Sequence, residues 1–157
     1  MTAQECASML KNNRIFQSVN ESRLEELVDG AQIKTFRRGN ELLSPGRGGR
    51  TMGMIITGSA AVNKGRAVIS TLVSGDIFGA VTLFSDEPSP ATTVTARVEC
   101  SAVFFKKDAI AQLIESEPGA AVGFAAYLSA RIRFLTRRIE ALTAGDSASK
   151  LLSYLLE

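Results

Sequence analysis

The sequence of 157 residues contains no histidine and no tryptophan. Without histidine there is no His-ligated haem, no His-based zinc site and no catalytic dyad or triad that uses an imidazole. Cys6 and Cys100 lie too far apart for a CxxC, zinc or iron–sulfur motif, so we interpret them as structural thiols rather than a redox pair. These absences favour a binding module over an enzyme and predict neither a metal nor a cofactor. A small barrel enzyme is the weakest alternative, because only scattered Asp and Glu would serve its chemistry.

Long apolar runs are also missing. No stretch of about 18 apolar residues could form a transmembrane helix, and the first residues lack the basic segment and apolar core of a secretory signal. We therefore predict a cytoplasmic protein with no membrane partner. The net charge of +2 is too small to indicate a nucleic-acid surface by itself. A hydrophobic content of 45% is typical of a folded chain, here one domain with an extension.

Short apolar or alternating segments, separated by turns rich in glycine, run through most of the chain. They predict strands at residues 31–36, 41–43, 52–57, 60–63, 66–73, 77–78, 91–96 and 100–105. Asn20 is expected to cap a helix over residues 21–28, and Asp108 a helix that ends at Glu117-Pro118-Gly119. Many short strands at regular intervals predict an antiparallel barrel or roll.

The most informative stretch is residues 75–96, GDIFGAVTLFSDEPSPATTVTA. It reads as a brief strand, Gly79, one helical turn, a loop with two prolines, and a further strand. A glycine before a helical turn lets unpaired N–H groups face an anion or a polar ligand. In the alternative interpretation the stretch only connects two strands. The Gly/Arg loop at 44–51 lacks a Walker A lysine and the GxGxxG spacing, so a mobile hairpin loop is favoured there over a phosphate cradle.

FG-x-x-x-LF, a loop and a strand ending V-x-A together resemble the phosphate-binding cassette of cyclic nucleotide-binding domains in the Crp/Fnr family of bacterial transcription regulators. The F-x-x-G-x-x-L rhythm from Phe36 and the stretch MIITGSAAV resemble the same family, and the resemblance covers about residues 10–156. It implies a mainly β fold with flanking helices: a double-stranded β-helix, or jelly-roll-like β-roll, followed by a long C-terminal dimerisation helix. Two positions depart from the nucleotide-binding version. Ala80 replaces its glutamate, and Pro90-Ala91 replaces its arginine–serine pair.

These departures predict that the pocket does not bind cyclic AMP tightly. Pro90 offers a phosphate neither charge nor N–H, and Ala80 offers a ribose hydroxyl no acceptor. Two losses of about 1–3 kcal/mol each weaken binding by several orders of magnitude. An apolar lining with hydroxyls suits a neutral or weakly polar small-molecule effector, although Arg66 or Arg97 could reach in. The candidate effector-binding residues are Val62, Ile69, Leu72, Phe78, Gly79, Ala80, Ala91, Thr92 and Thr93, with Leu128, Ile132 or Thr136 closing the pocket from the long helix.

A long helix is predicted from residue 120 to about residue 143. Its apolar residues recur in steps of four and three, which is the spacing of a coiled-coil seam. We interpret this stripe as a homodimer interface, because a helix that packs on its own barrel needs a wider apolar face. The arginines beside the seam are read as solvated flanks rather than DNA contacts; they are Arg131, Arg133, Arg137 and Arg138. The expected interface comprises Ala121, Ala125, Leu128, Ile132, Leu135, Ile139 and Leu142.

Gly145-Asp146 predicts the end of that helix and the cap of another over residues 147–156. In the resembled family such a helix opens a DNA-binding winged helix–turn–helix. The expected division is therefore a sensor domain at 1–117, a dimerisation helix at 118–144 and the start of a DNA-binding domain at 145–157. We expect the effector-sensing and dimerisation part of a regulator that binds DNA through a domain absent from this chain. The alternative is a dimerisation scaffold of the same fold without an effector.

Overall fold

The computed structural model describes residues 2–47, 49–87 and 89–155, with side chains described as far as residue 145. In this part of the chain the strands form two four-stranded sheets whose neighbouring strands are all antiparallel. The first sheet has the order β1 (Gln32–Phe36), β8 (Cys100–Lys106), β3 (Thr51–Thr57) and β6 (Ile77–Phe78). The second has the order β2 (Glu41–Leu43), β7 (Thr93–Ala96), β4 (Ser59–Lys64) and β5 (Ala67–Val73).

The chain passes repeatedly between the two sheets, which makes the fold a jelly-roll-like β-roll and confirms the predicted fold class. The glycine turns make these passages possible. Gly58, between β3 and β4, has a φ of +78°, and a Cβ there would lie 2.2 Å from the carbonyl oxygen of Glu99. Because side chains rarely adopt this backbone and have no room here, the turn requires glycine.

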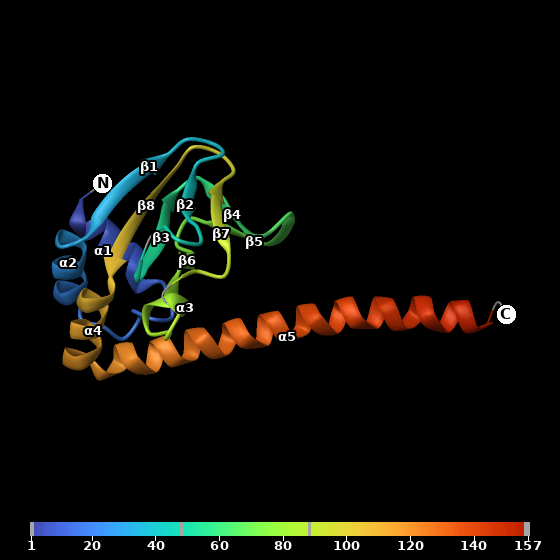
Figure 1. Cartoon of the computed structure of the whole chain (residues 1–157). Coiled ribbons are helices and arrows are strands. Elements are labelled where there is room, and N and C mark those ends of the chain that lie inside the picture. The colour runs from blue at the N-terminus through green and yellow to red at the C-terminus, as the bar shows by residue number, and fades with distance from the viewer. Residues whose placement is uncertain (1, 48, 88, 156–157) are drawn as a thin grey trace.

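Helices cover one end of the roll (Figure 1). They are α1 (Ala3–Lys11), α2 (Glu21–Asp29), α4 (Lys107–Ser116) and the first turns of α5 (Pro118–Leu155). As predicted, Asn20 caps α2, and its side chain accepts a hydrogen bond from the N–H of Ser22 at 3.2 Å. Helix α4 begins one residue before the predicted cap Asp108 and is capped by Lys106 without a side-chain hydrogen bond. Helix α5 then runs past the roll and projects beyond it (Figure 1).

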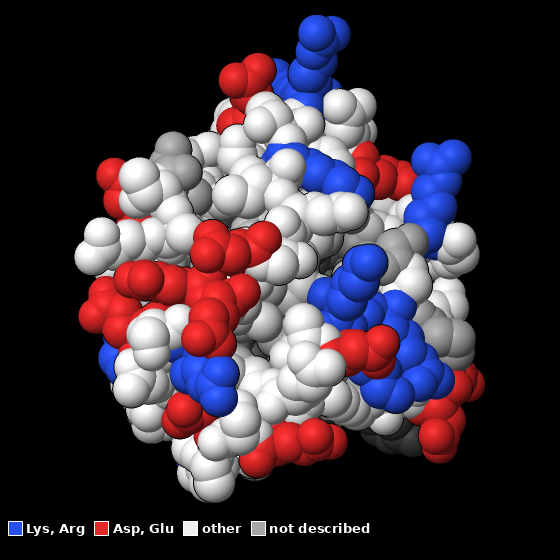
Figure 2. All heavy atoms as spheres, turned by 90° about the vertical axis from the view of Figure 1, so that its left-hand side faces the viewer, with Lys and Arg blue, Asp and Glu red and all other residues white. Residues whose placement is uncertain are grey.

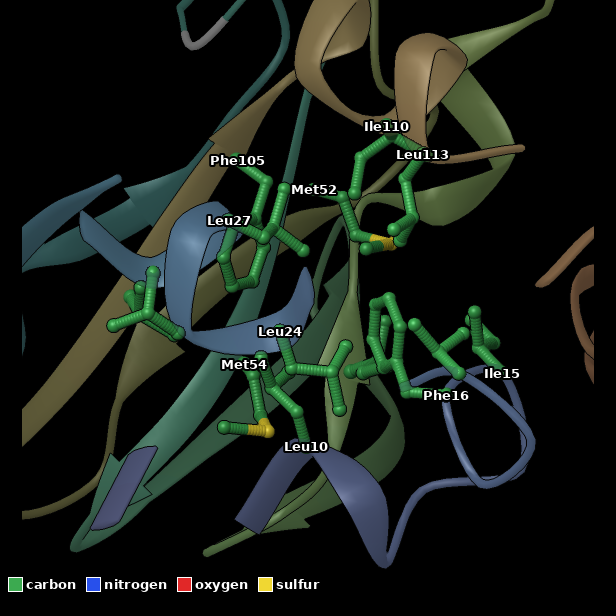
Figure 3. Packing of buried hydrophobic residues seen from close by; sticks show 14 of the residues in the cluster. Leu10, Ile15, Phe16, Leu24, Leu27, Met52, Met54, Phe105, Ile110 and Leu113 are labelled. Atoms are coloured by element: carbon green, nitrogen blue, oxygen red, sulfur yellow. The ribbon is translucent and has the colours of Figure 1, made fainter. Parts of the chain in front are cut away.

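One hydrophobic core lies between the first sheet and the helices (Figure 3). Met52, Met54 and Phe105 project from β3 and β8, and the helices and the loop after α1 cover them. Burial of each large apolar side chain contributes about 1.5–3 kcal/mol, so this core attaches the helices to the roll. The covering residues drawn in Figure 3 include Leu10, Ile15, Phe16, Leu24, Leu27, Ile110 and Leu113.

A second core lies between the two sheets. Phe78 packs edge-on against Phe104, with the ring centroids 5.6 Å apart. Gly53 makes room for this ring, since a Cβ at that position would lie 2.2 Å from Phe78 Cζ. The buried residues on the inner faces of the sheets include Leu42, Leu43, Ile55, Ala60, Val62, Leu72, Val94 and Ala96.

Helix α5 does not end at Gly145, so the predicted break at Gly145-Asp146 was wrong. A glycine inside a helix costs only about 1 kcal/mol relative to alanine, which the hydrogen bonds of the flanking turns offset. The helix begins at Pro118, before residue 120 but at the start of the expected dimerisation helix, 118–144; a missing N–H costs nothing in the first turn. The end of the predicted final helix, from Leu156, lies outside the described residues. The division into three domains stays a prediction.

Candidate effector-binding site

The stretch that resembles a phosphate cassette folds as strand β6, Gly79 and the short helix α3 (Ala80–Leu83). Gly79 adopts a φ of +75°, and a Cβ there would lie 2.6 Å from the carbonyl oxygen of Thr51. Glycine is therefore required on two counts, conformation and space. The hydroxyl of Thr82 donates to the Gly79 carbonyl oxygen at 2.8 Å and holds the turn together.

A cavity of about 250 Å³ lies between this turn, the second sheet and helix α5. Its size is just below the usual range for small-molecule sites, roughly 300–1,000 Å³. The structure brings most of the predicted effector residues from the roll to this cavity. Those that line it are Val62, Ile69, Leu72, Phe78, Gly79, Ala80, Ala91 and Thr92.

The structure does not bring the other four predicted residues to the cavity. Thr93 begins β7, and the next residue, Val94, lines the cavity in its place, since neighbouring strand residues face opposite sides. On the long helix, Ile132 is 65% exposed and Thr136 is also exposed, whereas Leu128 packs against the helical core. One turn of a helix spans 3.6 residues, so the rotation of α5 about its axis decides which residues face the roll.

The residues that α5 does present to the cavity are Tyr127, Arg131 and Leu135, spaced four apart. Tyr127 and Arg131 were not predicted, because only residues on or next to the coiled-coil seam were considered as pocket residues of the helix. The signal available in the sequence was the pair Tyr127 and Arg131, a polar and a charged residue four apart beside the apolar seam. Leu135 was assigned to the seam and is 41% exposed, so its side chain borders both the cavity and solvent. Other lining residues missed are Leu43, Ile77, Val81, Thr82, Pro90 and Val94.

Tyr127 joins helix α5 to the cassette by a hydrogen bond. Its hydroxyl donates to the carbonyl oxygen of Ile77 at 3.1 Å. Burial raises the pKa of Tyr127, and the nearby positive charge of Arg131 opposes that rise. The phenol is therefore a neutral hydrogen-bond donor at physiological pH.

Arg131 is not a solvated flank, so that interpretation was wrong for this residue. Its side chain is half-buried, its Nη2 lies 3.4 Å from the hydroxyl oxygen of Ser70, and its guanidinium lies 5.2 Å from the ring centroid of Phe134. Arg138 also reaches the roll and donates to the carbonyl oxygen of Val68 at 3.3 Å. Arg133 and Arg137 are exposed.

The two arginines considered as alternative cations do not line the cavity. Arg97 donates to the hydroxyl of Thr71 at 3.2 Å, and Arg66 is exposed in the turn before β5. Pro90 is buried and lines the cavity itself. Among the described residues that line the cavity, Arg131 therefore carries the only formal charge.

A second, more open pocket of about 350 Å³ adjoins the first and shares Leu72, Ile77, Tyr127 and Arg131 with it. Its lining is more polar and includes Asp76, whose Oδ2 accepts a hydrogen bond from the N–H of Val73 at 2.8 Å. Arg131 stands where the apolar cavity meets this polar pocket. A ligand with an apolar body and a polar head could occupy both.

The helical end of the roll presents a different surface. On this face a mainly acidic group and a mainly basic group of side chains lie apart, each with some side chains of the opposite charge (Figure 2). A groove of about 260 Å³ between α2 and α4 is edged by the exposed ion pair Arg23–Glu26, with 2.8 Å between nitrogen and oxygen. This face lacks the uniform positive charge that attracts phosphate backbones.

In the described part of the chain, no three His, Cys, Asp or Glu side chains gather closely enough to hold a metal ion. Among the same residues no helix is long and apolar enough to span a bilayer. Cys6 and Cys100 are buried and free, and burial raises the pKa of both thiols.

The predicted dimer seam has little cover within the single chain. Ile132, Ile139 and Leu142 are 65%, 61% and 72% exposed. Ala121 and Ala125 are exposed as well, and Leu128 is half-buried. A stripe of exposed large apolar residues is uncommon on a chain that works alone.

Residues 33–117 match the family model described as the cyclic nucleotide-binding domain. The chain belongs to this family. Among curated proteins, this cyclic nucleotide-binding domain is similar to the cAMP-dependent protein kinase regulatory subunit of Debaryomyces hansenii, with 31% identity over 84 residues. That match covers 53% of this chain and 19% of the relative, so the chain spans about a fifth of the relative's length.

Solved structures of bacterial regulators share the fold. The sensor domain of the transcriptional regulator DNR from Pseudomonas aeruginosa has a TM-score of 0.71 at 18% identity, covering 80% of this chain and 91% of that one. The catabolite activator protein of Thermus thermophilus has a TM-score of 0.71 at 18% identity, covering 83% and 63%. These matches confirm the resemblance of this cyclic nucleotide-binding domain to Crp/Fnr regulators at the level of the fold.

Proposed function

We propose that this chain is the effector-sensing and dimerisation part of a cytoplasmic Crp/Fnr-type transcription regulator, which binds DNA through a domain outside this sequence. The observation that carries the proposal is the position of α5. Tyr127, Arg131 and Leu135 close the cavity, and the same helix exposes Ile132, Ile139 and Leu142 on another face. A small molecule that binds between the roll and α5 would therefore shift a helix that also forms the dimer seam.

The proposed effector is not cyclic AMP. The resemblance aligns Pro90 with the arginine that holds the phosphate, and Pro90 is buried in the cavity wall without charge or N–H. Ala80 leaves a ribose hydroxyl without its carboxylate partner. A buried anion without paired donors costs several kcal/mol, so a cyclic nucleotide would bind weakly.

Isothermal titration with cyclic AMP and cyclic GMP tests the ligand part of the proposal. A sub-micromolar dissociation constant for either nucleotide contradicts it. The triple variant Ala80→Glu, Pro90→Arg and Ala91→Ser restores the residues of the nucleotide-binding version and should bind cyclic AMP about a hundredfold more tightly. Pro45→Arg, which adds an arginine in the exposed loop after β2, is the control and should change nothing.

Sedimentation equilibrium tests the dimerisation part. The unaltered chain should form a dimer, and the double variant Ile132→Ser and Ile139→Ser should be monomeric, because four apolar side chains leave the interface. Val122→Ser, at a position that is 70% exposed but off the seam, is the matched control and should stay dimeric. If the unaltered chain is monomeric at high protein concentration, the dimerisation part of the proposal is wrong.

The alternative function is a dimerisation scaffold without an effector. A thermal-shift screen separates the two, because a ligand that binds only the folded state raises the melting temperature. A binder whose effect disappears when Leu72→Trp fills the cavity supports the sensor. A dimer for which an extensive screen finds no such binder supports the scaffold.

A further inference from the structure

Arg131 is a half-buried cation without a countercharge. Within the described residues the one ion pair is Arg23–Glu26, so no carboxylate lies within 4.0 Å of the Arg131 guanidinium. Its polar contact is the neutral hydroxyl of Ser70, at the long distance of 3.4 Å. Partial desolvation of a charge is costly unless an opposite charge or strong acceptors compensate for it.

One of the two spaces that Arg131 borders, the 250 Å³ cavity, is apolar. Val62, Leu72 and Phe78 line the cavity from the roll, and among the described residues around it only Arg131 carries a formal charge. A ligand that fills the cavity must therefore combine an apolar body with a group that satisfies one guanidinium. A neutral apolar ligand would bury Arg131 further without pairing it.

We propose that the effector is a small amphipathic carboxylate, with its apolar body in the 250 Å³ cavity and its carboxylate on Arg131. The inference rests on the proposed function and names the ligand class of that same site. The planar guanidinium presents two parallel N–H donors that match the two oxygens of a carboxylate. Ser70 accepts from Arg131, so its own O–H is available to donate to the same carboxylate.

A carboxylate suits this site better than a phosphate. A single arginine neutralises one negative charge, and the remaining cavity wall at Pro90 supplies no donor. Asp76 lines the adjoining pocket, which Arg131 also lines, and would repel a second negative charge. Because the cavity lies at the small end of ligand sites, the apolar body is a short alkyl chain or a single ring.

The test compares acids with their neutral amides, which have nearly the same shape. Octanoate is compared with octanamide, and 3-phenylpropionate with 3-phenylpropanamide, by isothermal titration at millimolar ligand on the full chain. We expect at least one acid to bind about tenfold more tightly than its amide, since a charge-assisted bidentate pair exceeds a neutral hydrogen bond. Arg131→Gln should abolish this preference, and Arg131→Lys should retain part of it.

Arg133→Gln is the matched control, because Arg133 is exposed on the same helix and does not line the cavity. It should leave the preference for the acid unchanged, and melting curves should show that all three variants fold. Equal binding of acid and amide in both pairs, no binding of either acid, or a preference that survives Arg131→Gln would overturn the inference. Equal binding that Leu72→Trp abolishes would overturn it while leaving the effector site of the proposed function in place.

Discussion

The first turns of α5 and its distal part both carry large apolar residues, but the surroundings of these residues are opposite. Near the start, Ala120 and Phe124 are buried, and Phe124 packs edge-on against Phe84 with the ring centroids 5.6 Å apart. Farther along, Ile139 and Leu142 are exposed. The difference arises from two glycines in the first turns, since a helix can approach another backbone closely only where its side chains are absent.

Gly119 and Gly123 face the loop that follows α1. A Cβ at Gly119 would lie 2.5 Å from the hydroxyl oxygen of Ser18, and one at Gly123 would lie 2.4 Å from the carbonyl oxygen of Ile15. This contact makes the first turns of α5 part of the domain core. The comparison shows that the first turns of α5 belong to the domain core, whereas its distal part projects from the roll. The cavity lies between these two parts.

The largest effect is expected at the buried end. Phe124→Ala should lower the free energy of unfolding by about 3–5 kcal/mol, because it removes a buried ring and leaves a cavity. Phe134→Ala, on the distal part where the ring is 38% exposed, should cost less than about 1 kcal/mol. Urea unfolding of both variants measures the contrast. Similar losses would mean that the two parts of the helix are not distinct.

A smaller loss is expected from the addition of one methyl group. Gly123→Ala should destabilise the fold by about 1–3 kcal/mol, because the new Cβ clashes with the backbone of the loop after α1. Gly145→Ala adds the same group where nothing lies within 4 Å, and should gain up to about 1 kcal/mol from helix propensity. Changes of the same sign in denaturant titrations would contradict the close contact.

At the boundary of the two parts, Tyr127→Phe should cost about 1 kcal/mol through loss of the hydrogen bond to Ile77. Burial raises the pKa of Tyr127 above its ordinary value of 10.0. Its contribution to stability is therefore present below pH 10.0 and is lost as the pH rises through the folded-state value. The variant should lose less stability than the parent between neutral and strongly alkaline pH. Equal losses in thermal melts across that range would exclude Tyr127 as the titrating group.

The smallest effect is expected at the exposed end. Ile139→Ala should change the unfolding free energy by less than about 0.5 kcal/mol at protein concentrations where the chain is monomeric, because the side chain has little cover. The same variant should weaken self-association in sedimentation experiments. A large loss of monomer stability would show that the distal helix packs on its own roll.

Local patterns predicted most of the fold. Glycine turns and short alternating segments located the strands to within about two residues, and Gly79 marked the cassette turn. These features are local, since φ values and strand alternation depend on neighbouring residues. The same patterns located the roll half of the cavity in part, since eight predicted residues of the roll line it, whereas Thr93 does not and six other lining residues of the roll were missed.

The helix half of the cavity could not be predicted in this way. Leu128, Ile132 or Thr136 was expected to close the cavity, but Tyr127, Arg131 and Leu135 line it. The periodicity of a helix defines its apolar and polar faces but does not determine which face contacts the roll. Contact of Gly119 and Gly123 with a loop about a hundred residues earlier in the chain sets that rotation.

The amino-acid sequence by itself determined the β-roll, the cassette turn, the length of the apolar seam and the absence of an arginine within the cassette. Only the tertiary structure decided that Arg131 turns toward the cavity and that the seam stays exposed. The physical reason is that turns and alternation are set by short-range sterics, whereas the facing of a helix is set by close packing between segments distant in sequence.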